Sequence, residues 1–274
     1  MTIYTKRKKK LPRATILFNV LGYTFITIAA VICLIPFIML VSGSLTPEKE
    51  IIERGYSLFP QTVSFEAYRL AFKNPEDIFR AYGVSIFVTV VGTFIGLLII
   101  TMTAYVLSRK DFKYRNKLSF FFYFTTLFNG GLLSSYIFMI RVLNLKDSYL
   151  ALILPLIMNV FYLLIMKSFV GSIPDSICES AKIDGANDFV IVLKLIIPLS
   201  KAGLATIGLF FALDYWNDWY NAMLYMNDYH KYPLQYLLYN MLSSTDALSR
   251  ISTLSGVNMV ELPSRSLKLA MAVI

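Results

Sequence analysis

Residues 82–108 read YGVSIFVTVVGTFIGLLIITMTAYVLS, a run of 27 residues without a charged side chain. A helix that crosses about 30 Å of hydrocarbon needs about 20 predominantly apolar residues. Comparable charge-free runs cover residues 16–41, 118–140 and 148–166, with 26, 23 and 19 residues. The sequence therefore predicts an all-α fold that begins with four membrane-spanning helices.

Two weaker apolar segments extend the prediction to a polytopic bundle of about six transmembrane helices. Residues 202–226 are apolar in their first half and then contain acidic side chains among aromatic ones. Residues 269–274 have the composition of the start of a sixth span, which we expect to be truncated. The run 16–41 exceeds the roughly 7–15 residues of a signal-peptide core, so we interpret it as a retained helix. We interpret residues 1–274 as one transmembrane domain.

Charge predicts the orientation of this bundle. The chain is 57% hydrophobic and 16% charged, with a net charge of +9. Segments 6–13 and 109–117 carry +6 and +4, a sum of +10 that leaves −1 for the rest. Two spans separate these segments, and short basic segments beside membrane helices are typically cytoplasmic. We therefore expect a cytoplasmic tail (1–15), a multi-pass protein of the cell membrane and no nucleic-acid partner.

The same orientation assigns the remaining connections. Residues 42–81 and 227–268 are predicted to be external, and the loop 167–201 is predicted to be cytoplasmic. The one histidine, His230, has no metal-ligand cluster around it, so no metal is expected. Gly92 and Gly96 form a G-x-x-x-G pair, which indicates close packing against another helix.

The cytoplasmic loop reads KSFVGSIPDSICESAKIDGANDFVIVLKLIIPLSK over residues 167–201. Ser172 is placed to cap a first helix over residues 174–184. Gly185 can adopt the left-handed conformation that ends a helix. Asn187 or the aspartate after it can then cap a second helix.

That second helix is predicted over residues 189–197 and stops at Pro198. The first helix has small side chains, so another protein can approach it closely. Both ends of the loop are anchored in membrane helices, which favours a rigid lever. An ordinary interfacial hairpin is the alternative that these residues allow.

Part of this loop resembles the EAA signature of ABC importer permeases, E-A-A-x-x-D-G-A followed by a proline about a dozen residues later. The one departure is a serine in place of the first alanine. The resemblance implies a coupling helix that docks into a cleft of a cytoplasmic ATPase subunit. The residues of the signature, with Ser180 as the departure, are Glu179, Ser180, Ala181, Asp184, Gly185, Ala186 and Pro198.

The location of the signature between the fourth and fifth predicted spans is similar to that in maltose-type carbohydrate permeases. Residues 128–132, 143–148, 215–220 and 232–235 further resemble the multi-sugar branch related to lipoprotein-dependent polysaccharide uptake. The resemblance implies a second homologous permease, two copies of an ATPase subunit, an extracytoplasmic sugar-binding protein and the lipid bilayer as partners. It implies that this chain is not an enzyme and binds no cofactor, because the partner subunit uses the ATP.

Polar side chains within the apolar segments are candidates for the substrate pathway, because they are costly in hydrocarbon unless they face protein, water or ligand. Planar hydrogen-bonding groups and aromatic faces suit a sugar. An aromatic belt at the membrane interface and hydrogen bonding between helices are the alternatives, and the partner permease could hold the site instead. The candidates are Asn129, Asn159, Asp214, Trp216, Asn217, Asp218 and Trp219.

The predicted function is that of a permease subunit of an ATP-driven, binding-protein-dependent oligosaccharide importer. A permease for a non-sugar solute shares the loop signature and is the main alternative. A secondary transporter usually has internal repeats and ionisable midplane residues, and the absence of such repeats from the five to six predicted spans argues against it. A membrane-embedded enzyme needs a clustered catalytic constellation, and the sequence also lacks the G-x-x-x-x-G-K-[ST] nucleotide motif.

Overall fold

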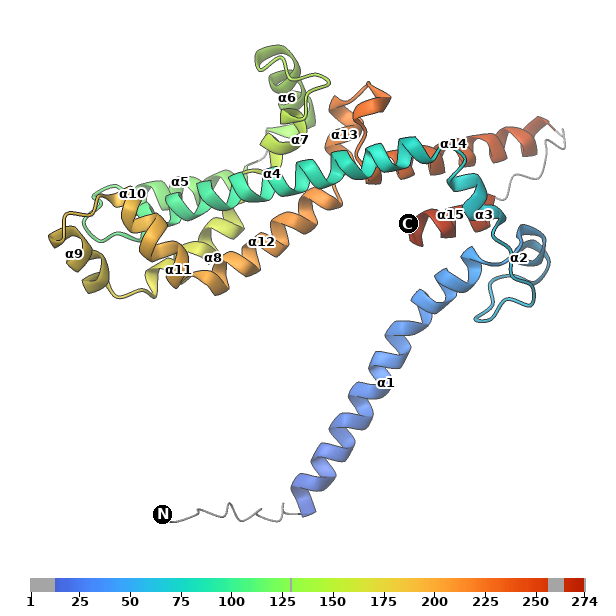
Figure 1. Cartoon of the computed structure of the whole chain (residues 1–274), viewed down its shortest axis with the longest axis horizontal. Coiled ribbons are helices and arrows are strands. Elements are labelled where there is room, and N and C mark those ends of the chain that lie inside the picture. Colours follow the sequence, from blue (N-terminus) through green and yellow to red (C-terminus); the bar gives the residue numbers. More distant parts are fainter. Residues whose placement is uncertain (1–12, 129, 256–263, 274) are drawn as a thin grey trace. The chain divides into compact units, whose positions relative to one another are not determined.

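The computed structural model describes residues 13–128, 130–255 and 264–273 (Figure 1). These described residues form helices and contain no strand, in agreement with the predicted all-α class. The chain divides into two compact units, one formed by Met1–Lys73 with Ser244–Ile274 and the other by Asn74–Ser243. The basic residues 6–10 of the N-terminal tail lie outside the described residues.

Two helices have the length and apolar composition of a complete membrane span: α1 (Arg13–Ser44) and α4 (Pro75–Ser108). Two helix pairs meet these criteria only when each pair is taken as one bent span, so up to four spans satisfy them in the described part of the chain. The bent pairs are Leu150–Leu156 with Val160–Gly171, bent by 58°, and Asp188–Leu199 with Lys201–Trp216, bent by 87°.

The first unit joins the end of α1 to the last described helix, α15. A Cβ atom on Gly43 would overlap the side chain of Leu269, so the glycine permits this close approach. The Glu48 carboxylate accepts the backbone N–H groups of Arg265 at 3.0 Å and Ser266 at 2.9 Å, which caps the N-terminus of α15. The other helices of this unit are α2 (Glu48–Arg54), α3 (Glu66–Ala71) and α15 (Ser264–Val273).

The predicted third span, residues 118–140, is broken, so the expectation of one continuous helix was wrong. The backbone of Phe128 is extended, with φ −125° and ψ 120°. Gly131 has a φ of +82°, a conformation that a residue with a Cβ atom rarely adopts, and it allows the helix to restart. The helical pieces are α5 (Arg115–Leu127), α6 (Gly131–Ile137) and the π-helical turn η1 (Phe138–Val142).

The predicted fourth span, residues 148–166, is bent within its apolar run. Pro155 lies in a 3-10 turn and cannot donate a backbone hydrogen bond. Asn159 Oδ1 accepts the N–H of Phe161 at 2.9 Å and caps the helix that restarts after it. The segment comprises α7 (Leu150–Ile153), the 3-10 turn η2 (Leu154–Leu156) and α8 (Val160–Gly171).

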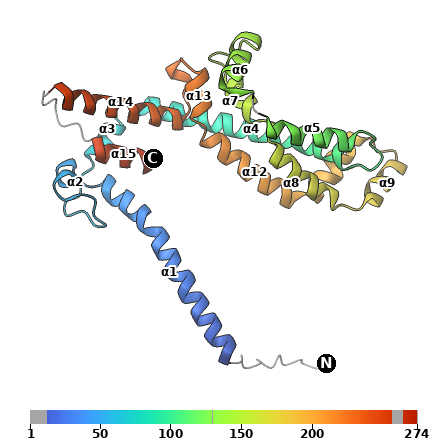
Figure 2. The same cartoon turned by 180° about the vertical axis from the view of Figure 1, so that it is seen from behind.

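The core of the second unit lies where α4 packs against α8 and α12 (Lys201–Trp216), which run alongside it in Figure 2. A Cβ atom on Gly92 would lie 2.5–2.8 Å from ring atoms of Tyr215, and one on Gly96 would lie 3.0–3.2 Å from the ring of Phe211. The Tyr215 hydroxyl donates to the carbonyl oxygen of Ile153 at 2.9 Å. The close packing predicted from the G-x-x-x-G pair is confirmed.

Short helical elements form the loop 167–201 and the segment that follows α12. The predicted external segment 227–268 contains α14, and the predicted helix 189–197 is a succession of α, π and α turns that runs on past Pro198. These elements are α9 (Asp175–Ile183), α10 (Asp188–Ile191), η3 (Val192–Ile196), α11 (Ile197–Leu199), α13 (Tyr220–Tyr225), η4 (Tyr229–Lys231) and α14 (Leu234–Ser255).

A single aspartate joins two connections of the second unit. Asp147, with a φ of 55°, accepts the backbone N–H groups of Asn227 at 2.5 Å and Asp228 at 2.8 Å. These hydrogen bonds hold the pKa of its carboxyl below the usual value. Lys231 Nζ donates to the Asp147 carbonyl oxygen at 2.9 Å. The turn before α7 is therefore held to the segment between α13 and η4.

Candidate functional site

The candidate site is built around α9, which carries the first part of the EAA-like signature. The predicted cap at Ser172 was wrong, because its hydroxyl donates to the carbonyl oxygen of Phe169 at 2.6 Å. Pro174 instead precedes the helix, with no side-chain cap. Asp175 lies in the first turn, where a carboxylate interacts favourably with the helix dipole.

The glycine turn after α9 forms as predicted. Gly185 has a φ of +84°. Its N–H donates to the carbonyl oxygen of Lys182 at 3.0 Å, and the N–H of Ala186 donates to that of Ala181 at 2.9 Å. This pair of bonds is the Schellman motif, which needs a residue with positive φ at this position. Asn187 then caps α10 by accepting the N–H of Val190 at 2.9 Å.

The signature residues lie on the exposed side of this hairpin. All nine residues of α9 are described, and none is buried. Ala181 and Ala186 are partly buried against the core, whereas the other five signature residues are exposed. Ile183 is 86% exposed, the largest fraction among the large apolar side chains of the described residues. This residue was not among the predicted site residues, although an isoleucine between Lys182 and Asp184 in a polar helix was a usable signal.

A cavity of about 440 Å³ lies behind α9, between that helix and the ends of α4 and α8. Charged groups and half-buried apolar groups share its wall. Burial raises the pKa of the Cys178 thiol in this wall. Cavity-lining residues include Tyr105, Arg109, Ile173, Cys178, Glu179 and Lys182.

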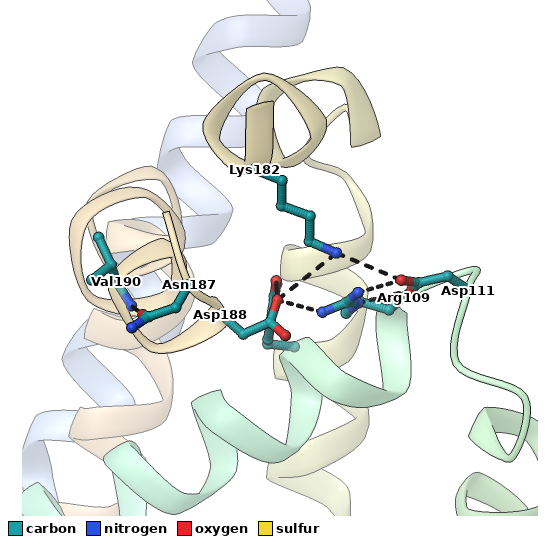
Figure 3. Close-up of polar contacts among 7 residues, drawn as sticks. Arg109, Asp111, Lys182, Asn187, Asp188 and Val190 are labelled. Carbon is teal, nitrogen blue, oxygen red and sulfur yellow. Dashed lines mark hydrogen bonds and ion pairs between the residues drawn. The ribbon is translucent and has the colours of Figure 1, made fainter. Parts of the chain in front are cut away.

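Four charged side chains meet beside the glycine turn (Figure 3). Arg109 is paired with both Asp111 and Asp188. Lys182 Nζ lies 3.6 Å from the Asp111 carboxylate and 3.9 Å from that of Asp188. The hydrogen bond from Arg109 holds the pKa of Asp111 well below its usual value. Tyr105 adds a hydroxyl donor to Asp188 at 2.9 Å. Two cations and two carboxylates therefore join the end of α4 to both sides of the turn.

The candidate pathway residues of α8 and α12 are linked through one tyrosine. Tyr162 donates its hydroxyl to Asp214 at 2.6 Å, and its backbone N–H lies 3.4 Å from Asn159 Oδ1. Asn217 donates to a carbonyl oxygen of its own helix at 2.8 Å. Asp218 accepts the side-chain amide of its neighbour Asn221 at 2.9 Å. Asn129 lies outside the described residues.

The two tryptophans beside these groups have aromatic partners. Trp216 lies 6.3 Å from the ring of Tyr82. Trp219 is stacked on Tyr239 at 4.3 Å between ring centroids, with an angle of 22° between the planes. Tyr236 continues the series at 6.5 Å from Tyr239. This ladder was not predicted, because Trp219 directly precedes α13 whereas the two tyrosines belong to α14.

Comparisons with known proteins identify the class. No family model matches the chain. Over 222 residues it is 44% identical to the polygalacturonan/rhamnogalacturonan transport system permease protein YtcP of Bacillus subtilis, which covers 81% of this chain and 77% of that protein. Protein LplC of the same organism is 37% identical over 99% of this chain and 90% of its own length.

A solved structure is also similar over almost the whole chain. It is the crystal structure of a bacterial ABC transporter involved in the import of the acidic polysaccharide alginate. The TM-score is 0.79 at 27% identity, with 97% of this chain and 94% of that chain covered. The class is therefore that of an integral membrane permease subunit of an ABC transporter. This chain belongs to the family of carbohydrate ABC transport system permeases that includes YtcP.

Proposed function

We propose that this chain is the membrane-spanning permease subunit of a binding-protein-dependent oligosaccharide importer, driven by ATP that a separate subunit hydrolyses. The proposal rests on the exposure and the fixed end of helix α9. It is exposed, it presents an apolar side chain at Ile183, and the turn at Gly185 fixes its end. Such a helix is suited to enter a cleft of another protein. The polysaccharides in the names of YtcP and of the similar transporter support the substrate class.

The assembly follows from this role. We propose a second homologous permease, two ATPase copies and an extracytoplasmic sugar-binding protein as partners in the lipid bilayer. The proposal retains about six spans in this chain. They are α1, α4, the broken segment of α5 and α6, the two bent pairs, and the apolar segment proposed at residues 269–274.

The proposed orientation places α9 and the 109–117 loop in the cytoplasm. Its support is the concentration of positive charge in that loop and in the N-terminal tail. In cells that carry Lys73→Cys or Lys113→Cys in a background without native cysteines, we expect a membrane-impermeant maleimide to label the first variant and not the second. Both are exposed lysines, so exposure is matched. Labelling only at residue 113 in intact cells would reverse the orientation.

The ladder formed by Trp219, Tyr239 and Tyr236 is proposed to contact the sugar, together with Asp214 and Asp218. Aromatic rings pack against the C–H face of a sugar, and carboxylates accept bonds from its hydroxyl groups. The uptake assay uses proteoliposomes with the complete transporter, labelled oligosaccharide, loaded binding protein and ATP. Uptake that needs ATP and the binding protein would support the function, and uptake without either would contradict it.

In this assay we expect Trp219→Ala to reduce oligosaccharide uptake roughly 2- to 10-fold. This corresponds to an aromatic contact of about 0.5–1.5 kcal/mol. Trp219→Phe should retain most of the activity because it keeps a ring. Tyr123→Ala removes an aromatic side chain of 50% exposure from α5 and serves as the control. Equal uptake by Trp219→Ala and the wild type would remove the ladder from the pathway.

A further inference from the structure

The tripeptide Arg109-Lys110-Asp111 is tied to α9 at both ends of that helix. At the N-terminal end, Lys110 Nζ lies 2.7 Å from the Asp175 carboxylate. At the C-terminal end, Lys182 Nζ lies 3.6 Å from Asp111. Beyond the glycine turn, Arg109 is paired with Asp188, the first residue of α10. Three consecutive residues therefore contact the two ends of α9 and the element that follows it.

Apolar packing holds α9 only weakly. None of its described side chains is buried, and only Cys178 and Ala181 are partly buried against the core cluster. The cavity of about 440 Å³ lies behind the helix, where a packed layer would otherwise restrain it. The position of α9 therefore depends largely on its polar contacts.

The tripeptide itself is fixed to α4. Arg109 follows the last residue of α4 directly, and its N–H donates to the carbonyl oxygen of Val106 at 3.4 Å. Its guanidinium lies 5.7 Å from the ring centroid of Tyr105, and its side chain is only 22% exposed. The Tyr105 hydroxyl also donates to Asp188. Since α4 packs along α8 and α12, the tripeptide is connected through α4 to the helical core of the second unit.

From this geometry we infer that Arg109, Lys110 and Asp111 are positioning residues, which fix α9 relative to the end of α4 and transmit the displacement of one to the other. The inference rests on the proposed function, in which an ATPase subunit moves α9. The partners Asp188, Lys182 and Asp175 are 39–57% exposed. Ion pairs of this exposure contribute little to folding. Their loss should therefore change the position of α9 without unfolding the protein.

The matched control comes from the same loop. Lys113 and Lys117 form no ion pair within the described residues, and both are exposed. Lys117→Gln removes the same positive charge from the loop as Arg109→Gln does, so any general effect of charge on membrane orientation is equal in the two variants. Only Arg109→Gln breaks a contact with α10.

The first measurement is the spin-label distance distribution between Ser176→Cys on α9 and Val106→Cys on α4, in the purified transporter without native cysteines. We expect Arg109→Gln and Lys110→Asp to broaden it and Lys117→Gln to leave it unchanged. The double variant Lys110→Asp with Asp175→Lys restores the ion pair with reversed charges and should restore the narrow distribution. The second measurement is the number of sugar molecules imported per ATP hydrolysed, which should fall at least 3-fold in the two broadened variants and recover in the double variant.

Unchanged distributions in Arg109→Gln and Lys110→Asp would overturn the inference, as would broadening in Lys117→Gln. Broadening without any change in sugar imported per ATP would show that the tie has no part in transport and would also overturn it. The distance measurement is repeated on the permease without ATPase subunits. If the wild-type permease never binds an ATPase, the proposed function is contradicted. The spin-label distances measured without the ATPase would still show whether the tripeptide fixes the position of α9.

Discussion

Gly185→Val is expected to reduce transport at least 10-fold while the permease remains in the membrane at the wild-type level. The residue has a φ of +84°, which costs a residue with a Cβ atom about 1–3 kcal/mol. A Cβ atom would meet nothing within 4 Å, so the cost arises from the backbone and not from a clash. The turn should therefore rearrange and displace α9. Transport and ATPase stimulation are measured in vesicles against permease abundance by immunoblot.

Two further variants isolate the cause of this loss. Gly171→Val adds the same side chain where no Cβ contact and no positive φ occurs, and it should remain active. Gly185→Asn should retain more activity than Gly185→Val, because asparagine tolerates the left-handed conformation better. Full transport by Gly185→Val at wild-type abundance would remove the turn from the mechanism.

Ile183→Ser addresses the proposed ATPase contact on the same helix. Burial of an isoleucine side chain contributes about 1.5–3 kcal/mol, so its loss should weaken ATPase binding by roughly 10- to 100-fold. Ile52→Ser is the control, since that isoleucine of α2 is 56% exposed and lies outside the loop. Co-purification of the ATPase subunit with each variant provides the measurement. Equal recovery with Ile183→Ser and the wild type would place the contact elsewhere.

The second large effect is expected for Gly92→Leu, which should abolish the stable assembly of the second unit. A Cβ atom at this position would lie within 2.8 Å of the Tyr215 ring, and three more carbons follow it. Overpacking of a dense core costs about 1–3 kcal/mol, and here α12 would also lose the hydrogen bond from Tyr215 to Ile153. The melting temperature of the detergent-solubilised transporter is the measurement.

Gly83→Leu provides the control for that substitution on the same helix. Gly83 is exposed, and a Cβ atom there would have no neighbour within 4 Å. It changes helix propensity and apolarity as Gly92→Leu does, but it should leave the melting temperature close to that of the wild type. If Gly92→Leu and Gly83→Leu lower the melting temperature equally, the effect comes from the loss of glycine and not from the contact with Tyr215.

Apolar length predicted the two long helices well but not the broken ones. The run at residues 82–108 is one helix because no residue in it disturbs the backbone. Residues 118–140 satisfied the same criterion, yet the positive φ of Gly131 follows a break. Hydropathy measures how many apolar residues occur in a row and says nothing about continuity of the backbone. The cap at Asn159 was readable in principle, since asparagine before a helix satisfies its free N–H groups.

In the candidate site, features that depend on neighbouring residues were predicted, whereas contacts between distant residues were not. The turn at Gly185 and the cap at Asn187 were predicted because each depends on a few adjacent residues. The pair formed by Arg109 and Asp188 joins residues 79 positions apart, and no local pattern specifies it. The loops 109–117 and 167–201 were both predicted to be cytoplasmic, so a contact between them was possible. The prediction did not indicate which residues would form it.

The half-buried thiol of Cys178 gives this protein a built-in reporter. It lies on α9, in the wall of the cavity between that helix and the end of α4. Burial raises its pKa and so keeps the reactive thiolate scarce while α9 is seated. Because alkylation is irreversible, its rate in a chain whose other cysteine, Cys33, is replaced would report how often α9 leaves the core. The chemistry of one native sulfur atom would then measure how often α9 is displaced, without an added label.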